Sequence, residues 1–389
     1  MERKKIRKLN PPSTIGIIGG GQLGRMLTVE AKRMGYHVVV LDPKENAPAG
    51  QVADQQITAD FSDLGALKEL AQMTDVITFE FEHINVELLN QLEGEGYWVF
   101  PSSNTLRKIQ NKYIQKCMLR ENGIPTPEFY SINSLEELKD KFNKLGNKAI
   151  LKTCKEGYDG KGNMIIHKIE EIEQAFYKFE KAEIMVEKLI DFTKEVSIIV
   201  ARNQEKIEFY PVSENVHKNS ILIKSMIPAN ISLETEKVIQ NLSKRIVDLF
   251  DDYGVFCIEF FIDSNSNVLV NEIAPRPHNS GHYSIEGCIC SQFEQLIRII
   301  TGMPLGSSEL RMPCVMYNIL GSQDTDGTYY VSGVDSLLAL PDCHLHLYGK
   351  PETNYLKKIG HITAIDTSVE KADNKAKNGL SKLKIVTRN

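Results

Sequence analysis

Residues Val270–His282 read VNEIAPRPHNSGH, an apolar strand that ends in an acid and continues into arginine, histidine and asparagine. Carboxylates bind hard metal ions, while guanidinium and imidazole groups bind anions. The stretch therefore predicts a site for a metal ion and for anionic ligands at the end of one strand.

A second apolar strand, Val255–Ile262, precedes this one across an asparagine- and serine-rich turn. If Asn265 and Ser266 form a two-residue loop, Glu259 lies directly opposite Glu272 on one face of the hairpin. Two carboxylates about 5 Å apart repel each other by roughly 3 kcal/mol at an effective dielectric constant of about 20. We therefore expect a proton on one acid or a cation between them, and oxygen ligands favour Mg²⁺. The alternative is a longer loop that leaves one glutamate in solvent.

The composition is that of a folded protein of two or three domains, with 389 residues, 42% hydrophobic and 25% charged. A formal net charge of -5 gives no indication of nucleic-acid binding. The seven cysteines include no C-x-x-C pair, which is typical of reduced thiols and indicates the cytoplasm. Residues 1–12 are basic without a following apolar core, so we expect a disordered tail, and no apolar run has membrane-spanning length.

The first domain opens with a β-α-β pattern. The strand Thr14–Ile18 is followed by the glycine turn Gly19–Gly24, a helix over Arg25–Met34 and the strand Val38–Leu41, which ends at Asp42. G-x-G-x-x-G with an acid about 20 residues on fits the dinucleotide fingerprint, so a nicotinamide or flavin enzyme is one alternative. A glycine turn at a helix N-terminus binds any phosphate, so a substrate monophosphate is the other.

Further along, the strand that begins at Val76 ends in Glu80 and Glu82. Ligands bind at the ends of strands in parallel sheets, so either acid is a candidate for ribose hydroxyls, and a solvated glutamate is the alternative for each. The pattern over Thr105–Asn122 predicts one helix closed by Gly123, and a second domain is expected to begin after it.

That second domain contains a glycine-rich loop between the strands Ala149–Thr153 and Met164–His167. Backbone amides of such a loop close over polyphosphate, and Lys152 and Lys161 add positive charge. The loop lacks the Walker pattern, and a plain hairpin turn is the alternative. Two more strands, Ile184–Ile190 and the one beginning at Lys194, are expected to complete this α+β unit.

Taken together, Lys152, the Gly157–Gly162 loop, Glu187–Ile190, Glu195 and the Glu259/Glu272 pair resemble the ATP-grasp superfamily in their order and spacing. Within it, the chain resembles the 5-(carboxyamino)imidazole ribonucleotide synthases of purine biosynthesis over nearly its whole length. The motifs that carry this resemblance are GGGQLGRM at 19–26, TFEFE at 78–82, GYDGKG at 157–162 and NEIAPRPHNSGH at 271–282.

The resemblance implies a mixed α/β and α+β fold of the ATP-grasp type. An N-terminal Rossmann-like (pre-ATP-grasp) domain with a parallel sheet would span 13–123, and a lid domain would span 124–203. An antiparallel-sheet ATP-grasp domain would span 204–389 and bind the substrate phosphate through its tail. The family also implies a homodimer that acts on small molecules, with no nucleic-acid or membrane partner.

The implied activity is that of a carbon–nitrogen ligase. ATP would phosphorylate bicarbonate to carboxyphosphate, and the amine of 5-aminoimidazole ribonucleotide would then be carboxylated. Glu259 and Glu272 are implied to hold Mg²⁺ while Lys112 and Lys152 neutralise the phosphates. The residues implied to bind ATP are Lys112, Lys152, Gly157, Tyr158, Asp159, Gly160, Lys161, Gly162, Asn163, Glu187, Lys188, Leu189, Ile190, Glu195, His217, Asn271 and Glu272.

The resemblance also implies catalytic and substrate-binding residues. Arg276 and His278 would bind bicarbonate or carboxyphosphate, while Tyr158, Asp159 and Lys161 close over it, and Asp159 is a candidate for steering the proton of the amine. A structural imidazole is the alternative for His282, and solvated lysines are the alternative in the tail. The residues implied to bind the nucleotide substrate are Gly21, Gln22, Leu23, Glu80, His282, Lys350, Lys357 and Lys358.

Two positions depart from the family's pattern. Lys357 stands where arginine is common, which removes a bidentate donor for phosphate, and Glu156 stands where glycine is usual. Two other functions are weighed against the ligase. A dinucleotide-dependent oxidoreductase accounts only for the first forty-odd residues, and a catalytically dead ATP-binding scaffold would need a broken acid pair or glycine loop.

Overall fold

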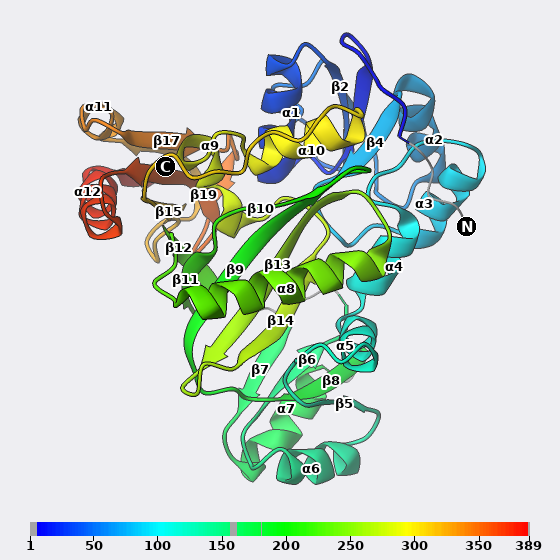
Figure 1. The fold of residues 1–389 in the computed structure, drawn as a ribbon, viewed down its shortest axis with the longest axis vertical. Helices are drawn as coiled ribbons and strands as arrows, with labels where there is room; N and C mark the ends of the chain where they lie inside the picture. Colours follow the sequence, from blue (N-terminus) through cyan, green and yellow to red (C-terminus); the bar gives the residue numbers. More distant parts are fainter. Residues whose placement is uncertain (1–5, 156–161, 180, 388–389) are drawn as a thin grey trace.

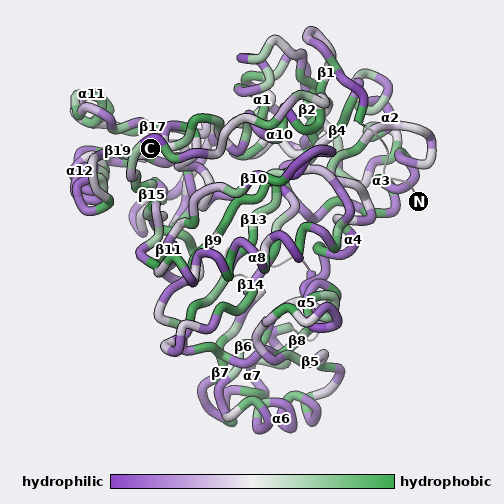
Figure 2. Tube along the Cα trace, viewed as in Figure 1, coloured by the Kyte–Doolittle hydropathy of each residue, from purple (hydrophilic) through white to green (hydrophobic). Residues whose placement is uncertain are grey.

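The computed structural model describes residues 6–155, 162–179 and 181–387. Within these residues the strands form four sheets, which Figure 1 shows as an N-terminal unit, a long central sheet, a small unit below it and a C-terminal extension. Figure 2 shows the central strands as largely hydrophobic, whereas α12 at the edge is mostly hydrophilic. No described helix combines the length and apolarity needed to cross a membrane.

The N-terminal unit is a parallel sheet of four strands in the order β3-β2-β1-β4, which confirms the predicted Rossmann-like opening. The glycine turn after β1 leads directly into α1. The strands are β1 (Thr14–Ile18), β2 (His37–Asp42), β3 (Gln55–Thr58) and β4 (Val76–Phe79), and the helices are α1 (Gln22–Arg33), α2 (Leu64–Met73) and α3 (Val86–Gly94).

The helix predicted over Thr105–Asn122 is wrong, because the chain forms two helices, α4 (Ser103–Gln110) and α5 (Lys112–Glu121). Asn111 lies between them with an extended backbone, and its side chain accepts hydrogen bonds from the amides of Tyr113 and Ile114. An asparagine that caps a new helix competes with continuation of the old one. The break makes Lys112 the first residue of α5, where its amide donates to the Cys154 carbonyl at 2.8 Å.

The small unit is an antiparallel sheet in the order β5-β8-β6-β7, and its helices cover one face. Leu138 and Phe142 from α6 and Ile172 from α7 pack in one core with Leu151 and Val186 of the sheet. The elements are β5 (Phe129–Ile132), α6 (Leu135–Lys144), β6 (Ala149–Thr153), β7 (Asn163–Ile166), η1 (Ile169–Glu171), α7 (Ile172–Lys178) and β8 (Ile184–Lys188).

The central sheet follows the order β14-β13-β9-β11-β12-β15-β19-β17, with β10 paired to β9. Alternate residues of β9 face opposite sides. Val196, Ile198 and Val200 pack with α8 (Leu233–Phe250), whereas Ile199 and Ala201 pack with α10 (Gln292–Ile300) and the N-terminal unit. The strands are β9 (Phe192–Arg202), β10 (Ile207–Phe209), β11 (Ser213–Lys218), β12 (Ile221–Ile227), β13 (Gly254–Asp263), β14 (Val268–Ala274), β15 (Cys314–Leu320), β17 (Cys343–Leu347) and β19 (Lys358–Ile365).

The sheets divide the chain at a different point from the predicted domain boundary at 203/204. Strand β9 was expected to complete the lid unit, but it pairs with β13 over most of its length in the central sheet. The last strand of the small sheet in the chain is β8, which ends at Lys188 and pairs with β5 on one side and β6 on the other. The domain limits 13–123, 124–203 and 204–389 stay predictions.

The remaining elements join the units. Helices α1 and α10 lie side by side (Figure 1), and Arg33 of α1 reaches Glu294 of α10 at 2.5 Å. A three-stranded sheet and α12 cover the C-terminal end of the central sheet. The elements are α8 (Leu233–Phe250), η2 (Asn279–Gly281), α9 (Ser284–Gly287), α10 (Gln292–Ile300), β16 (Gly327–Ser332), α11 (Val334–Leu338), β18 (Glu352–Thr353), α12 (Val369–Lys382) and β20 (Lys384–Thr387).

Candidate active site

Glu259 and Glu272 lie directly opposite each other on β13 and β14, as the sequence predicts. The loop is nevertheless one residue longer than expected, because the Asp263 amide donates to the Asn267 carbonyl and Ser266 adopts a positive φ of 63°. A bulge then leaves Asn271 unpaired on β14, which shifts the register back by one residue. The extra loop residue and the bulge offset each other in the pairing register, so the two carboxylates lie on one face of the hairpin.

The acid pair lies in a partly buried, negatively charged environment. The Glu259 side chain is 16% exposed and that of Glu272 is 40% exposed. Burial, reinforced by the carboxylates of Glu195 and Glu272, raises the pKa of Glu259 to about 7. A nearby cation would therefore stabilise the ionised form of Glu259, which is the property expected of a cation site.

Lys112 supplies part of that charge by contacting the Glu272 carboxylate. Burial opposes the charge of its ammonium group, but the carboxylates of Glu272, Glu82 and Glu259 outweigh burial and raise the pKa of Lys112. The start of α5 therefore places an ammonium group beside the acid pair, and the role of Lys112 in neutralising phosphates stays a prediction.

A second cluster of cations surrounds a buried carboxylate. Glu187 on β8 receives the ammonium groups of Lys152 at 3.1 Å and Lys116 at 2.8 Å. Burial raises the pKa of Glu187, but the two lysines outweigh it and lower the pKa overall. Burial, with the charge of Lys152, lowers the pKa of Lys116 to about 8 in spite of its pairing with Glu187.

Sequence reasoning missed Lys116, although a signal for it existed. Lys116 follows Lys112 by four residues, so the two lie on one face of α5. Its ammonium group also lies 2.8 Å from the Thr126 hydroxyl and 3.4 Å from the Val270 carbonyl, which ties α5 to the linker and to β14.

Glu195 and His217 meet on the neighbouring strands β9 and β11. The Nδ1 atom of His217 lies 2.8 Å from a Glu195 carboxylate oxygen. Burial lowers the pKa of His217, but Glu195 outweighs burial and raises it. The two residues predicted to bind the nucleotide are thus brought together on the face that carries Glu259.

Arg276 forms a two-pronged pair with Glu82, its Nε and Nη2 atoms lying 2.6 Å and 3.0 Å from the two carboxylate oxygens. Burial alone would raise the pKa of Glu82, but the Arg276 charge outweighs it and lowers the pKa to about 2. Glu82 follows β4 and Arg276 follows β14, so the pair joins the N-terminal unit to the acid hairpin and fixes the arginine beside it.

The two predicted histidines occupy different environments. His278 directs Nε2 toward Glu259 at 3.8 Å, and burial with the charges of Arg276 and Lys358 lowers its pKa to about 3. His282 is 0% exposed, its ring lying 4.7 Å from that of His361 and 5.7 Å from that of Phe293. Burial drives the pKa of His282 well below its ordinary value. A substrate-binding role for His282 stays a prediction, and neither of its buried ring nitrogens has a hydrogen-bond partner among the described residues.

The glycine turn binds two carboxylates of the protein itself. Asp42 accepts from the Gly20 amide at 2.7 Å, and Glu80 accepts from the amides of Gly21 and Gly24. A side chain at Gly21 would collide with Glu80, since a Cβ there would lie 2.5 Å from the carboxylate. Because Asp42 is engaged by the turn, it does not face outward toward a ribose, which disfavours the dinucleotide alternative. Burial raises the pKa of Glu80.

Two segments that are far apart in the sequence meet at the start of α1. Lys350 donates to the Gln22 side chain at 2.9 Å and to the Lys358 carbonyl at 2.7 Å. Burial, followed by the positive charge of Lys44, lowers the pKa of Lys357. The amides of Gln22 and Leu23 begin α1, where a helix supplies no carbonyl partners. Amides and cations together form a corner suited to a phosphate.

Several predicted ATP-binding residues lie around β6, β7 and β8. Asn163 pairs with Lys152 across β6 and β7, and the Gly162 carbonyl accepts from the Thr153 amide at 2.9 Å. Leu189 and Ile190 follow β8 toward β9, and Lys188 at the end of β8 is exposed. The predicted residues Gly157, Tyr158, Asp159, Gly160 and Lys161, and the departure at Glu156, lie outside the described residues.

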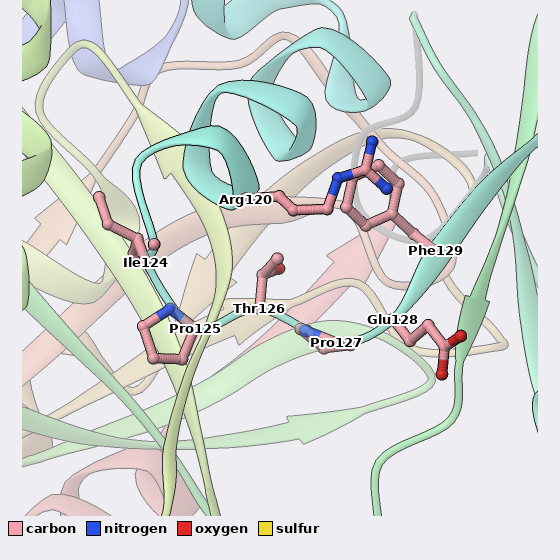
Figure 3. A pocket seen from close by; sticks show the side chains of 8 residues that line it. Arg120, Ile124, Pro125, Thr126, Pro127, Glu128 and Phe129 are labelled. Atoms are coloured by element: carbon pink, nitrogen blue, oxygen red, sulfur yellow. The ribbon is translucent and has the colours of Figure 1, made fainter.

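A pocket of about 250 Å³ opens at the linker between α5 and β5 (Figure 3). The Arg120 guanidinium lies over the Phe129 ring at 4.6 Å on one side of it, and prolines form the floor. The pocket contains no residue predicted to bind ATP, metal or substrate, so it belongs to the linker rather than to the acid pair. Its lining residues are Arg120, Gly123, Ile124, Pro125, Thr126, Pro127, Glu128 and Phe129.

Three protein families match the chain in succession. The ribonucleotide synthetase preATP-grasp domain matches residues 13–110, the ATP-grasp domain matches 117–293, and the phosphoribosylaminoimidazole carboxylase C-terminal domain matches 314–375. The fold and the paired acids with their lysines thus define an ATP-grasp ligase, and the predicted fold class is confirmed.

Similar proteins and solved structures identify the family within the ATP-grasp ligases. N5-carboxyaminoimidazole ribonucleotide synthase of Brucella melitensis is 40% identical over 92% of this chain and 97% of its own. The solved synthetase of Thermotoga maritima is 42% identical with a TM-score of 0.88, covering 97% of this chain and 100% of its own. The Aspergillus clavatus enzyme, solved with ADP and 5-aminoimidazole ribonucleotide, is 32% identical with a TM-score of 0.87, covering 95% and 98%. The chain belongs to the N5-carboxyaminoimidazole ribonucleotide synthase family.

Proposed function

We propose that the enzyme uses ATP to carboxylate the exocyclic amine of 5-aminoimidazole ribonucleotide, forming N5-carboxyaminoimidazole ribonucleotide in purine biosynthesis. The observation that carries this proposal is the similarity, over 95% of the chain, to a synthase solved with ADP and that ribonucleotide. The predicted ligase and its ATP-grasp fold agree with the family to which the chain belongs.

Bicarbonate is the proposed carbon source. ATP transfers its γ-phosphoryl group to a bicarbonate oxygen, giving carboxyphosphate and ADP. Cleavage of the carbon–oxygen bond of carboxyphosphate releases phosphate and carbon dioxide, and the amine attacks that carbon and loses a proton. The site must therefore hold anions in sequence and keep water from the intermediate.

We assign the ATP end of the site to the two lysine clusters. Lys112, which contacts Glu272, and Lys152, which pairs with Glu187, are proposed to neutralise a polyphosphate. Glu187 and the segment through Ile190 are proposed to contact adenine, and Glu195, held by His217, the ribose. Lys116 would act indirectly by holding Glu187.

Glu259 and Glu272 fit a magnesium ion, because they are paired oxygen donors and the raised pKa of Glu259 marks an unmet demand for positive charge. A magnesium ion held by these two carboxylates would supply positive charge for phosphate oxygens during phosphoryl transfer. Arg276 is proposed to orient bicarbonate, since the Glu82 pair holds its guanidinium rigidly. His278 beside it is neutral and is proposed as a hydrogen-bond partner of the same anion.

The phosphate of the ribonucleotide is proposed to bind at the corner formed by the start of α1 and the loop before β19. Lys350 joins these two segments by donating to the Gln22 side chain. Lys357 and Lys44 are two further cations that repel each other, and a bound anion would reduce that repulsion. Gly21 and Glu80 shape the turn rather than facing the corner. The proposed catalytic roles of Tyr158, Asp159 and Lys161 concern residues outside those described.

A homodimer and the cytoplasm complete the proposal. Support for a dimer comes from exposed apolar side chains on and near the paired helices α1 and α10, such as Val29 and Ile289. Support for a reducing compartment comes from the seven cysteines, all of them free thiols.

The proposal is tested by measuring ADP release with ATP, Mg²⁺ and bicarbonate, with and without 5-aminoimidazole ribonucleotide. The ribonucleotide is expected to stimulate ADP release, and radioactively labelled bicarbonate is expected to label the product. Glycinamide ribonucleotide with formate is the control. Stimulation by that pair alone would keep the ATP-grasp fold and overturn the substrate.

A further inference from the structure

Cys257, Glu259 and His278 form a mixed sulfur, oxygen and nitrogen cluster at one end of the acid pair. One ligand atom from each lies within 4.8 Å of the other two. Cys257 and Glu259 are two residues apart on β13 and therefore project from the same face. His278 follows β14 and directs Nε2 toward Glu259 at 3.8 Å.

The cluster has a supporting shell. The Ser280 hydroxyl lies 2.9 Å from His278 Nδ1 and 3.7 Å from Cys257 Sγ, and it accepts a hydrogen bond from Ser197 at 2.7 Å. A metal on Nε2 requires the proton on Nδ1, which the Ser280 hydroxyl can accept at 2.9 Å once the contact from the Ser280 amide to Nδ1, at 3.4 Å, is given up. The Ser280 hydroxyl therefore contacts both the imidazole and the thiol.

The spacing fits a small transition-metal ion. Metal–ligand bonds of about 2.0–2.3 Å in a tetrahedral site place ligand atoms roughly 3.5 Å apart. Small side-chain rotations close the remaining gap, and the 16% and 22% exposure of Glu259 and His278 leaves a route of entry. Mg²⁺ prefers oxygen ligands only, whereas a thiolate, an imidazole and a carboxylate favour Zn²⁺ or Co²⁺.

We propose that Cys257, Glu259 and His278 form a transition-metal site that takes Zn²⁺ and competes with the acid pair for Glu259. Binding forms a sulfur–metal bond and releases the thiol proton to solvent, and the fourth position stays open to water. Because Glu259 belongs to both sites, an ion on the thiol side withdraws it from Glu272. Zn²⁺ therefore inhibits ATP turnover, and this consequence rests on the proposed function, whereas binding itself does not.

Binding is tested on the full chain without substrates by titration with Co²⁺. The wild-type protein is expected to show sulfur-to-cobalt charge-transfer absorption, which Cys257→Ala abolishes. Cys343→Ala, which removes another buried thiol in a different core, is expected to keep it. If Cys257→Ala fails to fold by circular dichroism, Cys257→Ser supplies the same test, since a hydroxyl gives no such band. Absence of the band in wild type, or its persistence without Cys257, overturns the site.

Inhibition is tested by Zn²⁺ titration of ADP release at constant Mg²⁺, each variant being compared with its own uninhibited rate. Loss of one ligand is expected to weaken Zn²⁺ inhibition about tenfold or more in Cys257→Ala. Equal inhibition of wild type and Cys257→Ala overturns the competition for Glu259. A protein that shows the cobalt band but no Mg²⁺-dependent turnover would retain the metal site and refute the proposed function.

Discussion

The ammonium group of Lys116 lies 2.8 Å from the Glu187 carboxylate in the interior, where the side chains are only 3% and 2% exposed. Lys244 and Asp248 form an ion pair of the same length on the surface, with 61% and 40% exposure. Because the two pairs differ mainly in burial, they separate the effect of desolvation from that of distance.

We expect Lys116→Met to lower the free energy of unfolding by about 3 kcal/mol, because it leaves a buried carboxylate with one cation instead of two. Lys244→Met should cost less than about 1 kcal/mol, since water screens the exposed pair. Urea unfolding of both variants at neutral pH measures the difference. Equal losses would show that the buried cluster adds no more than a surface pair does.

Glu272→Gln should lower the rate of Mg²⁺-dependent ATP turnover by about 100-fold or more, because an amide replaces one of the two carboxylates opposed on β13 and β14. Glu272 is 40% exposed, so the melting temperature should change little. Glu87→Gln, at an exposed carboxylate on α3, is the matched control for both measurements. Turnover at the wild-type rate in Glu272→Gln would refute the metal assignment.

Lys350→Ala should raise the KM for 5-aminoimidazole ribonucleotide about tenfold, since it removes a charged donor and its link to Gln22. Bicarbonate-dependent ADP release without the ribonucleotide should be nearly unchanged, because Lys350 lies at the start of α1 and not at the acid pair. Lys384→Ala, at an exposed lysine of β20, controls for loss of charge. Loss of the ribonucleotide-independent reaction in Lys350→Ala would contradict this division of the site.

The acid hairpin shows what the sequence predicts well. Apolar alternation and turn residues locate β13 and β14 within one or two residues, since burial on one face determines the strand period. The pairing of Glu259 with Glu272 is predicted correctly from a loop that is one residue too short. Local sequence does not reveal the bulge at Asn271, because residues on either side of it are held by α5, through Lys116 to the Val270 carbonyl and Gln115 to the Ile273 amide.

Contacts between segments that are far apart in the chain are harder to predict from the sequence. Lys350 and Gln22 are brought together by the whole fold, and resemblance rather than residue pattern predicts their meeting. The break at Asn111 was missed because the apolar period continues through it, whereas the cap depends on one side-chain hydrogen bond. The engagement of Asp42 and Glu80 by the glycine turn was missed because strand-end acids are usually read as facing ligands.

The Arg276–Glu82 pair predicts how stability depends on pH. The pKa of Glu82 falls from an ordinary value of 4.5 to about 2 in the folded protein, so the unfolded chain binds the proton more tightly. The stabilisation is therefore complete above about pH 4.5 and is lost as the pH falls toward about 2, and it amounts to roughly 3 kcal/mol.

Glu82→Gln removes this dependence but leaves Arg276 without its carboxylate. We expect the variant to be less stable than wild type at neutral pH, and the difference to shrink as the pH falls from 4.5 toward 2. Urea unfolding at a series of pH values measures the difference, with Glu87→Gln as control because the Glu87 side chain is 68% exposed. A difference that stays constant through the acid range would show that Arg276 does not hold Glu82 ionised, and the rigid anchoring of that arginine beside the acid pair would then be incorrect.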